Sequence, residues 1–500
     1  MVRASGSLAL RAVLAVVLLV GFYVLALALA IGLLLLPVAE VVYLNDLHPR
    51  LDLLCLVGAL VILWSLRPRP DRFEPPGPLL DEARYPELFR ELRAVAEATG
   101  QAMPREVYLV PEINGWVAQR GGVMGFGSRR VMGLGLPLMQ LVTVPQLRAV
   151  LAHEFGHFHG GDTLLGPWIY RTRAAIGRTT GTLASARVAF LELLRVPFEL
   201  YGRLFLRITQ AISRAQEYAA DALAARTQGA RALMEGLRRI HGTATAFGPY
   251  WSQEVVPALE SGFRPPIARG FARFIATERH ATAIEEALQT ALTEDRRDPY
   301  DSHPPLRERL AALERLDPGP SSHDDTPAIR LLGDLDAAEL ALLRTLVADA
   351  AAVDRLKPVP WEALATELYL PTWTERVRLH RDALEGLTPA TIPVVPDDLV
   401  AFARDALGPR ALGAHRSDLV GFAVGLLSCA IALLLVDEGF VLQTEPGEPI
   451  RCVRGNERVE VLETLLKRMR GELTDARWAE IVADLGIADR DLAGPDRATC

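Results

Sequence analysis

Residues 149–162, AVLAHEFGHFHGGD, contain the pattern on which the interpretation of this sequence depends. His153 and His157 are four residues apart, so on an α-helix both imidazoles lie on one face, one turn apart. That spacing offers two nitrogen ligands to a single zinc ion. Glu154 lies between them and leans toward the same side, where it is placed to take a proton from an attacking water. The segment therefore predicts a metal-dependent hydrolytic site with Glu154 as its base.

The flanking sequence favours a helix at this position. Thr143 and Pro145 are typical of a helix start, and Gly160-Gly161 is expected to end the helix. Three apolar residues supply a face that packs on the core: Leu147, Val150 and Leu151. The two histidines are therefore expected on an ordered, partly buried helix.

A catalytic zinc ion needs a third protein ligand and an open position for water. A third histidine six residues after the HExxH pair is one solution, but Thr163 occupies that position. A glutamate on a later helix is the other common solution. Residues 213–225, SRAQEYAADALAA, supply Glu217, with Asp221 one turn later and Arg214 just before. Glu217 is therefore the candidate third ligand.

Three segments in this order resemble the signature blocks of the membrane zinc metallopeptidases that include the bacterial heat-shock protease HtpX and the CAAX prenyl proteases. The segments are LAHEFGHFHGGD (151–162), SRAQEYAADALAA (213–225) and SHPPLRERLAAL (302–313). The resemblance covers roughly residues 80–315. It implies one zinc ion per subunit, held by the two histidines and Glu217. It also implies that Asp221, with Arg214, orients a ligand.

The third block implies a catalytic role for His303. Two roles are open, and both need this histidine near the metal. It donates a hydrogen bond to the oxyanion, or its neutral imidazole occupies the open position of zinc in the resting enzyme. Family members also have a strand before the zinc helix that pairs with extended substrate, and here VMGLGLP (131–137) is the candidate. The element before that strand departs from the family pattern, as Asn114-Gly115-Trp116.

Two apolar runs near the N-terminus predict a transmembrane hairpin. Residues 12–39 carry no charge, and about 20 apolar residues already span a bilayer. The run is longer than the apolar core of a cleavable signal peptide, which is about 7–15 residues. A second run, 51–66, follows closely and carries Asp52 near its start. The loop between the runs holds Glu40, Asp46 and a single arginine, Arg50. The other nearby arginines flank the hairpin: Arg3, Arg11, Arg67, Arg69 and Arg72.

The positive-inside rule places the N-terminus and everything after Arg67 in the cytoplasm. We therefore expect a multi-pass protein of the cell inner (cytoplasmic) membrane, in contact with the lipid bilayer, with its catalytic domain facing the cytoplasm. Between the first two zinc blocks the charges argue against further spans and favour an amphipathic helix at the membrane surface. These charged residues are Arg171, Arg173, Arg178, Arg187, Glu192, Arg195, Glu199 and Arg203.

A third apolar run, 419–436, has two interpretations. It is long enough to span a membrane, yet Asp437 and Glu438 follow it directly. The residues after them, 439–455, have a strand–turn–strand pattern, GFVLQT-EPGEP-IRCVRG. A helix buried against that small sheet explains the same residues as a third span does, and we favour the buried helix slightly.

The fold class expected is mainly α: a zincin-like metallopeptidase domain, with helices and a small β-sheet, on an N-terminal transmembrane hairpin, followed by an α+β C-terminal region. Two proline-rich stretches mark linkers, RPRPDRFEPPGP (67–78) and DPGPSSHDDTP (317–327). The expected segments are the transmembrane hairpin (1–66), the first linker (67–78), the metallopeptidase domain (79–316), a helical region of unknown role (328–416) and a C-terminal region with an apolar helix and a small hairpin (417–500).

The net charge of −7 gives no electrostatic footprint for nucleic acid. The expected function is that of a membrane-anchored zinc metalloendopeptidase whose substrates are unfolded or membrane proteins, in quality control of the membrane or envelope. The alternative is a signal-transducing membrane metalloprotease that cleaves a specific regulator, because a long C-terminal region lies outside the resemblance. The intact Glu154 speaks against a catalytically silent scaffold.

Overall fold

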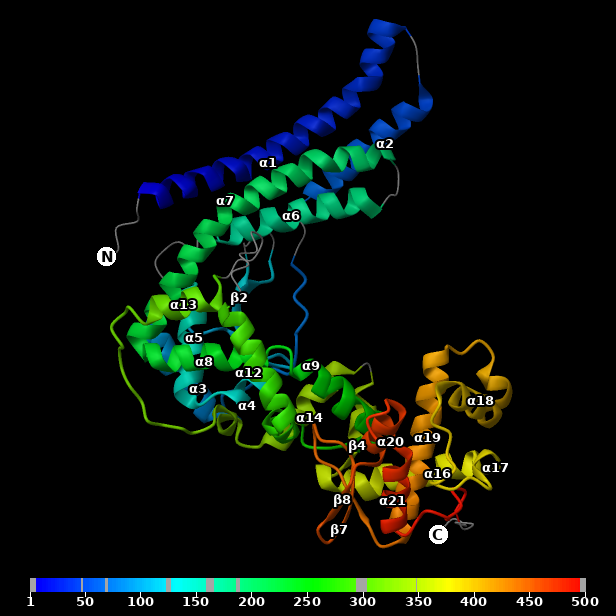
Figure 1. Ribbon diagram of the computed structural model, residues 1–500. Coiled ribbons are helices and arrows are strands. Elements are labelled where there is room, and N and C mark those ends of the chain that lie inside the picture. The colour runs from blue at the N-terminus through cyan, green and yellow to red at the C-terminus, as the bar shows by residue number, and fades with distance from the viewer. Residues whose placement is uncertain are drawn as a thin grey trace. The chain divides into compact units, whose positions relative to one another are not determined.

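A computed structural model describes residues 6–45, 48–67, 71–122, 127–158, 166–185, 189–293, 304–347 and 349–494. It is mainly helical with small sheets, which confirms the expected fold class (Figure 1). The chain divides into two compact units. Unit 1 comprises Met1–Ala244 and Ala283–Ala348, and unit 2 comprises Thr245–Thr282 and Asp349–Cys500. One segment of unit 2, Thr245–Thr282, therefore lies within the part of the sequence that resembles the peptidases.

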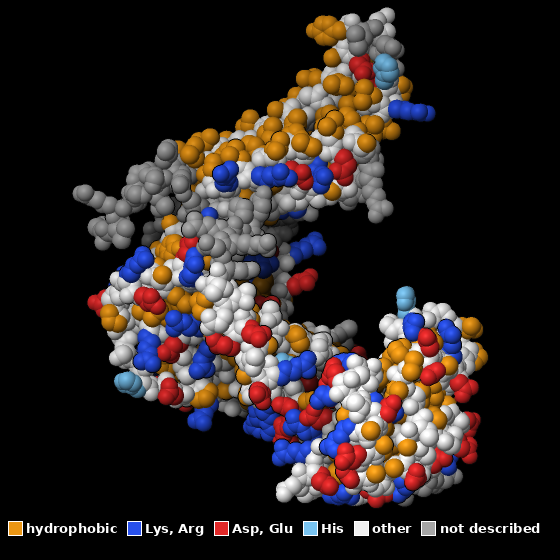
Figure 2. Space-filling view, in the orientation of Figure 1, with side chains coloured by type: hydrophobic (Ala, Val, Ile, Leu, Met, Phe, Trp, Pro, Cys, Tyr) orange, Lys and Arg blue, Asp and Glu red, His pale blue; other side chains and the backbone are white. Residues whose placement is uncertain are grey.

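The N-terminal hairpin of unit 1 consists of two apolar helices, α1 (Gly6–Ala39) and α2 (Pro49–Leu66), with a π-helical turn (Glu40–Leu44) following α1. Both helices are long and apolar enough to cross a membrane. Their outward side chains are apolar as well; Val24 is 60% exposed and Leu60 is 56% exposed. Figure 2 shows this apolar surface over the hairpin. Water disfavours so large an apolar patch, whereas lipid tails do not.

Two later helices of unit 1 lie alongside the hairpin: α6 (Gly166–Ser185) and α7 (Ala189–Gln228) (Figure 1). Apolar side chains of all four helices form one buried cluster, in which the rings of Phe22 and Phe198 meet edge to face. The hydroxyl of Tyr201 donates a hydrogen bond of 2.7 Å to the carbonyl oxygen of Leu18. The charged segment expected at the membrane surface therefore packs lengthwise against the hairpin, because its apolar face is buried there.

A three-stranded sheet precedes the zinc helix, with strands β1 (Glu106–Val110), β2 (Gly115–Arg120) and β3 (Arg129–Gly135). The strand order is β1-β3-β2, with β3 parallel to β1 and antiparallel to β2. Gly133 is required in β3, because a Cβ there would lie 2.3 Å from the ring of Trp116. Backbone hydrogen bonds join Leu80 to Val107 and Leu109 to Pro78, so the outer edge of β1 is covered.

This strand order corrects one expectation. Residues 131–137 are the segment expected to pair with substrate, but residues 131–135 lie in β3, between the two other strands. The last two residues begin helix α4. Because its neighbours occupy both of its edges, β3 has no backbone edge to offer, and the expectation is wrong. The sheet has two edge strands, β1 and β2. Residues 78–80 cover the outer edge of β1, so β2 is the other edge strand.

The remaining helices of unit 1 include α5, which carries the HExxH pattern. Helix α5 packs against α3, α7 and α8, and α13 packs against α7 and α8. Their bounds are α3 (Pro86–Thr99), α4 (Leu136–Leu141), α5 (Val144–Gly156), α8 (Ala230–Thr243), α13 (Leu306–Leu313) and α14 (Leu335–Leu346). Helix α12 (Glu278–Thr293) is divided between the two units.

Unit 2 is built around helix α19 (Arg416–Asp437), which packs against α16, α18, α20 and β7. By length and composition α19 is a third candidate span, but 72% of its apolar window is buried, against 22% and 28% for the first two. That burial favours a helix enclosed by unit 2. The strands β6 (Val441–Gln443), β7 (Arg451–Arg454) and β8 (Glu457–Val459) form an antiparallel sheet beside it.

The other elements of unit 2 are short. Its helices are α9 (Phe247–Tyr250), α10 (Val256–Glu260), α11 (Ile267–Ala276), α15 (Ala350–Asp354), α16 (Leu370–Leu379), α17 (Arg381–Leu384), α18 (Pro396–Leu407), α20 (Val461–Met469) and α21 (Asp475–Asp484). Two further strands, β4 (Phe263–Arg264) and β5 (Lys357–Pro358), pair in parallel. Strand β5 thereby joins residues 263–264 to the C-terminal part of unit 2.

Candidate metal centre

Helix α5 begins where the sequence predicts. The side-chain oxygen of Gln146 accepts a hydrogen bond of 3.1 Å from the backbone N–H of Thr143, and proline stands in the first turn. Three of its core-facing residues are buried: Leu147, Val150 and Leu151. The helix ends at Gly156, earlier than the expected Gly160-Gly161, and His157 caps it. Residues 159–165 lie outside the described residues.

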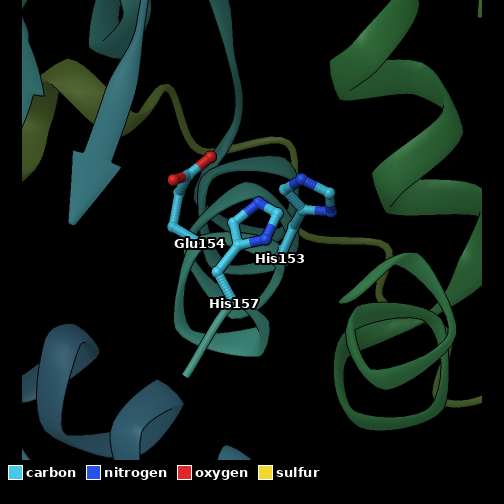
Figure 3. A group of neighbouring side chains, drawn as sticks. All are labelled: His153, Glu154 and His157. Carbon is cyan, nitrogen blue, oxygen red and sulfur yellow. The ribbon is translucent and has the colours of Figure 1, made fainter. Parts of the chain in front are cut away.

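The HExxH side chains lie close together on α5. The imidazole rings of His153 and His157 are 4.8 Å apart between centroids and nearly perpendicular. Potential ligand atoms of His153, Glu154 and His157 all lie within 4.8 Å of one another (Figure 3). His153 is buried, whereas the other two side chains are half-buried. One side of this group is therefore fixed in protein and the other is accessible.

Glu217 on α7 lies close to both histidines. One of its carboxylate oxygens lies 3.5 Å from Nε2 of His153, and the other lies 3.6 Å from Nε2 of His157. This approach depends on two small residues where α5 and α7 meet. A Cβ on Gly156 would lie 2.8 Å from Cα of Ala220, so a larger residue at position 156 would push the two helices apart.

The donor set fits zinc. Ligand atoms about 2.0–2.1 Å from a tetrahedral zinc ion are roughly 3.4 Å from one another. Each imidazole Nε2 lies at a comparable distance from one oxygen of the Glu217 carboxylate, 3.5 Å for His153 and 3.6 Å for His157. Two neutral imidazoles and one carboxylate are also the ligands of catalytic zinc sites that keep a fourth position open. Glu154 lies beside the two histidines.

Two further buried residues contact His153. Nδ1 of His153 lies 2.8 Å from Oδ1 of Asp221, and the guanidinium of Arg309 binds both oxygens of Asp221, at 2.9 and 2.7 Å. Burial lowers the pKa of His153, but hydrogen bonds with Asp221 and Glu217 raise it, to about 9 overall. Burial raises the pKa of Asp221, but hydrogen bonds from Arg309 and His153 bring it below its ordinary value. A metal that binds Nε2 of His153 would therefore have to displace a proton from this imidazole.

Two of the predicted site residues, Arg214 and His303, are not placed at the site by the described structure. Arg214 lies on α7, one turn before Glu217, and is half-buried, but among the described residues Arg309 is the arginine that contacts Asp221. His303 lies outside the described residues. Sequence reasoning missed Arg309, because an arginine in a short helix is normally solvated. Only its place in the third signature block, six residues after His303, hinted at a role.

Comparison with known proteins bears on the same region. Residues 82–317 match the model of Peptidase family M48. A protein named "Protease HtpX homolog" from Paraburkholderia phytofirmans is 26% identical over 236 residues, which cover 42% of this chain and 77% of that protein. Proteins of the same name from Burkholderia mallei and Burkholderia thailandensis are 28% and 26% identical over the same coverage. No solved structure matches the chain.

A helix with the HExxH pattern, joined by a glutamate from a second helix, defines the class as a zinc metallopeptidase. Over residues 82–317 the chain belongs to peptidase family M48, and the expected family is confirmed. The protein is an M48 zinc metallopeptidase with candidate membrane-spanning helices at its N-terminus.

Proposed function

We propose that the protein is a membrane-anchored zinc endopeptidase with one zinc ion per subunit, held by His153, His157 and Glu217. The observation that carries the proposal is the convergence of the two Nε2 atoms on the Glu217 carboxylate, at 3.5 and 3.6 Å. Zinc bound there would polarise the scissile carbonyl and acidify the attacking water. Glu154 takes the proton from that water and delivers it to the leaving amine.

Substrate backbone binds along β2 in this proposal. Strand β2 is an edge of its sheet, and it packs against α5, the helix that carries Glu154. The opposite edge of the sheet is covered by residues 78–80. An extended peptide that pairs with β2 would thus gain backbone hydrogen bonds beside the HExxH helix. Such binding requires an unfolded or extended segment, which supports unfolded and membrane proteins as the substrates.

The membrane arrangement follows from the hairpin and its flanking arginines. Helices α1 and α2 span the inner membrane, with the catalytic region on the cytoplasmic side. Tyr201 and Phe198 of α7 contact α1 midway along its length, so α7 lies at the same depth as the anchor. One arginine near this depth is paired: Arg195 lies 3.0 Å from both Glu192 and Glu199. Pairing of this kind lowers the cost of charge near lipid.

A pair of reporter fusions tests this topology. We expect a reporter placed after Arg72 and another placed after Cys500 both to report the cytoplasm, because α19 is enclosed by unit 2. A fluorescent reporter that fails to mature outside the cytoplasm is suitable. An extracytoplasmic signal after Arg72 would overturn the orientation. An extracytoplasmic signal after Cys500 alone would make α19 a third span.

Hydrolysis itself is tested with the full-length protein in detergent. Purified protein should contain about one equivalent of zinc and should cleave unfolded casein at many positions. A chelator should abolish cleavage, and added zinc should restore it, because the ligands persist when the metal leaves. Cleavage that continues undiminished after complete removal of metal would contradict the proposed function.

One observation favours a second function, cleavage of a single regulator in response to a signal. A cavity of about 470 Å³ lies within unit 2, lined by aromatic and ionisable side chains that include Trp373, Arg376 and Glu254. Its size is that of small-molecule sites. A survey of proteins cleaved in native membranes separates the two functions. Many unfolded substrates support quality control, whereas one defined substrate supports the signalling protease.

A further inference from the structure

Arg309 is a buried arginine at the back of the metal centre. It lies on α13 and is 5% exposed. Arginine is almost never fully buried unless it is paired. Arg309 belongs to the third signature block (302–313), so this block contributes a residue that packs beside the site.

The guanidinium of Arg309 grips Asp221 with two hydrogen bonds. Nε donates to Oδ2 at 2.9 Å and Nη2 donates to Oδ1 at 2.7 Å. Asp221 is 1% exposed, so this pair is shielded from water. A bidentate bond from a planar guanidinium fixes the plane of the carboxylate as well as its position.

The same carboxylate oxygen orients a metal ligand. Oδ1 of Asp221 lies 2.8 Å from Nδ1 of His153, while Nε2 of that ring faces Glu217 at 3.5 Å. A hydrogen bond at Nδ1 selects the tautomer whose Nε2 lone pair is available to a metal. Nη2 of Arg309 also lies 3.4 Å from both ring nitrogens of His153, which is longer than its 2.7 Å bond to Asp221. The orientation of His153 thus depends mainly on Asp221, and that of Asp221 depends on Arg309.

Arg309 also balances charge within the site. Its Nη1 lies 3.9 Å from Oε2 of Glu217, the same oxygen that faces Nε2 of His153. One cation therefore faces two buried carboxylates, Asp221 and Glu217. Without it, Asp221 would be a buried charge that has lost its bidentate partner and could turn away from His153. Helix α13 is further held to α7 by a 3.2 Å hydrogen bond from Tyr218 to Glu308.

We infer that Arg309 is a positioning residue for zinc, acting through Asp221 on His153. The inference rests on the proposed function, since it assumes that His153 is a zinc ligand. It predicts that Arg309 sets zinc affinity although it is not one of the proposed ligands. It also predicts that its effect disappears once Asp221 can no longer orient the imidazole.

The test is a double-mutant cycle on zinc affinity in the full-length protein in detergent. Zinc affinity is measured by competition with a chelator for the wild type, Arg309→Met, Asp221→Asn and the double variant. Thermal unfolding of each metal-free protein reports folding separately. Arg307→Met is the matched control, because this arginine lies on the same helix but is exposed. Arg309→Lys keeps the charge but not the two-pronged bond, and it serves if the methionine variant does not fold.

We expect Arg309→Met and Asp221→Asn each to weaken zinc binding by about 10- to 100-fold. The double variant should bind zinc as tightly as whichever single variant has the lower zinc affinity. Arg309→Lys should lie between wild type and Arg309→Met, and Arg307→Met should match wild type. Losses that multiply in the double variant would overturn the inference, as would unchanged zinc affinity in folded Arg309→Met or Arg309→Lys. A wild-type protein that binds no zinc would instead overturn the proposed function.

Discussion

Glu154→Gln should abolish peptide hydrolysis and leave zinc bound. The amide has the shape of the carboxylate but cannot accept the proton of the attacking water. General-base catalysis typically contributes about 10²–10⁴-fold to rate, so we expect a loss of at least about 100-fold in casein cleavage. The three proposed ligands are untouched, so zinc content should stay near one equivalent. Both quantities are measured on the same purified sample.

The matched control for this variant is Glu97→Gln. Glu97 is an exposed residue of α3, so the same chemical change there should leave both cleavage and zinc content at wild-type values. If Glu154→Gln retained cleavage within about threefold of wild type, the base would have to be another group. If it lost zinc as well as activity, Glu154 would belong to the ligand set and the assignment of Glu217 would need revision.

The part of the site that lies on one helix could be predicted from the sequence, because local rules determine it. Periodicity places His153 and His157 on one face, and Thr143 with its neighbouring proline starts the helix. The position of Glu217 depends instead on how α7 crosses α5, which the close meeting of Gly156 and Ala220 permits. Its place on a later predicted helix made this glutamate a candidate. The resemblance between signature blocks was needed to select it.

Features that depend on long-range packing were predicted less well. The sequence of β3 indicates a strand but not that two neighbours would enclose it, because strand order is not encoded in a single alternation. The charges of α6 and α7 indicate that one face is exposed. They do not predict that α1 and α2 bury the opposite, apolar face. Arg309 was missed for a related reason: its buried partner, Asp221, lies 88 residues earlier in the chain.

Glu217→Ala should lose the metal, not merely the activity. Glu217 is 4% exposed and faces the Nε2 atoms of both histidines. Its removal leaves two imidazoles as the only proposed ligands, whereas a catalytic zinc ion needs three protein ligands. We expect zinc affinity to fall by more than the roughly 10- to 100-fold typical of losing an outer hydrogen-bond partner. His157→Ala should behave in the same way.

Metal analysis after dialysis against a weak chelator measures this loss, with casein cleavage recorded in parallel. The matched control is Glu308→Gln, because Glu308 lies at the same interface between α7 and α13 and bonds Tyr218, but it does not face the histidines. That variant should keep its zinc. Unfolding of metal-free Glu217→Ala should remain cooperative, which separates loss of a ligand from loss of the fold. If folded Glu217→Ala kept one equivalent of zinc with wild-type affinity, Glu217 would not be the third ligand, and a residue outside the described ranges would have to supply it.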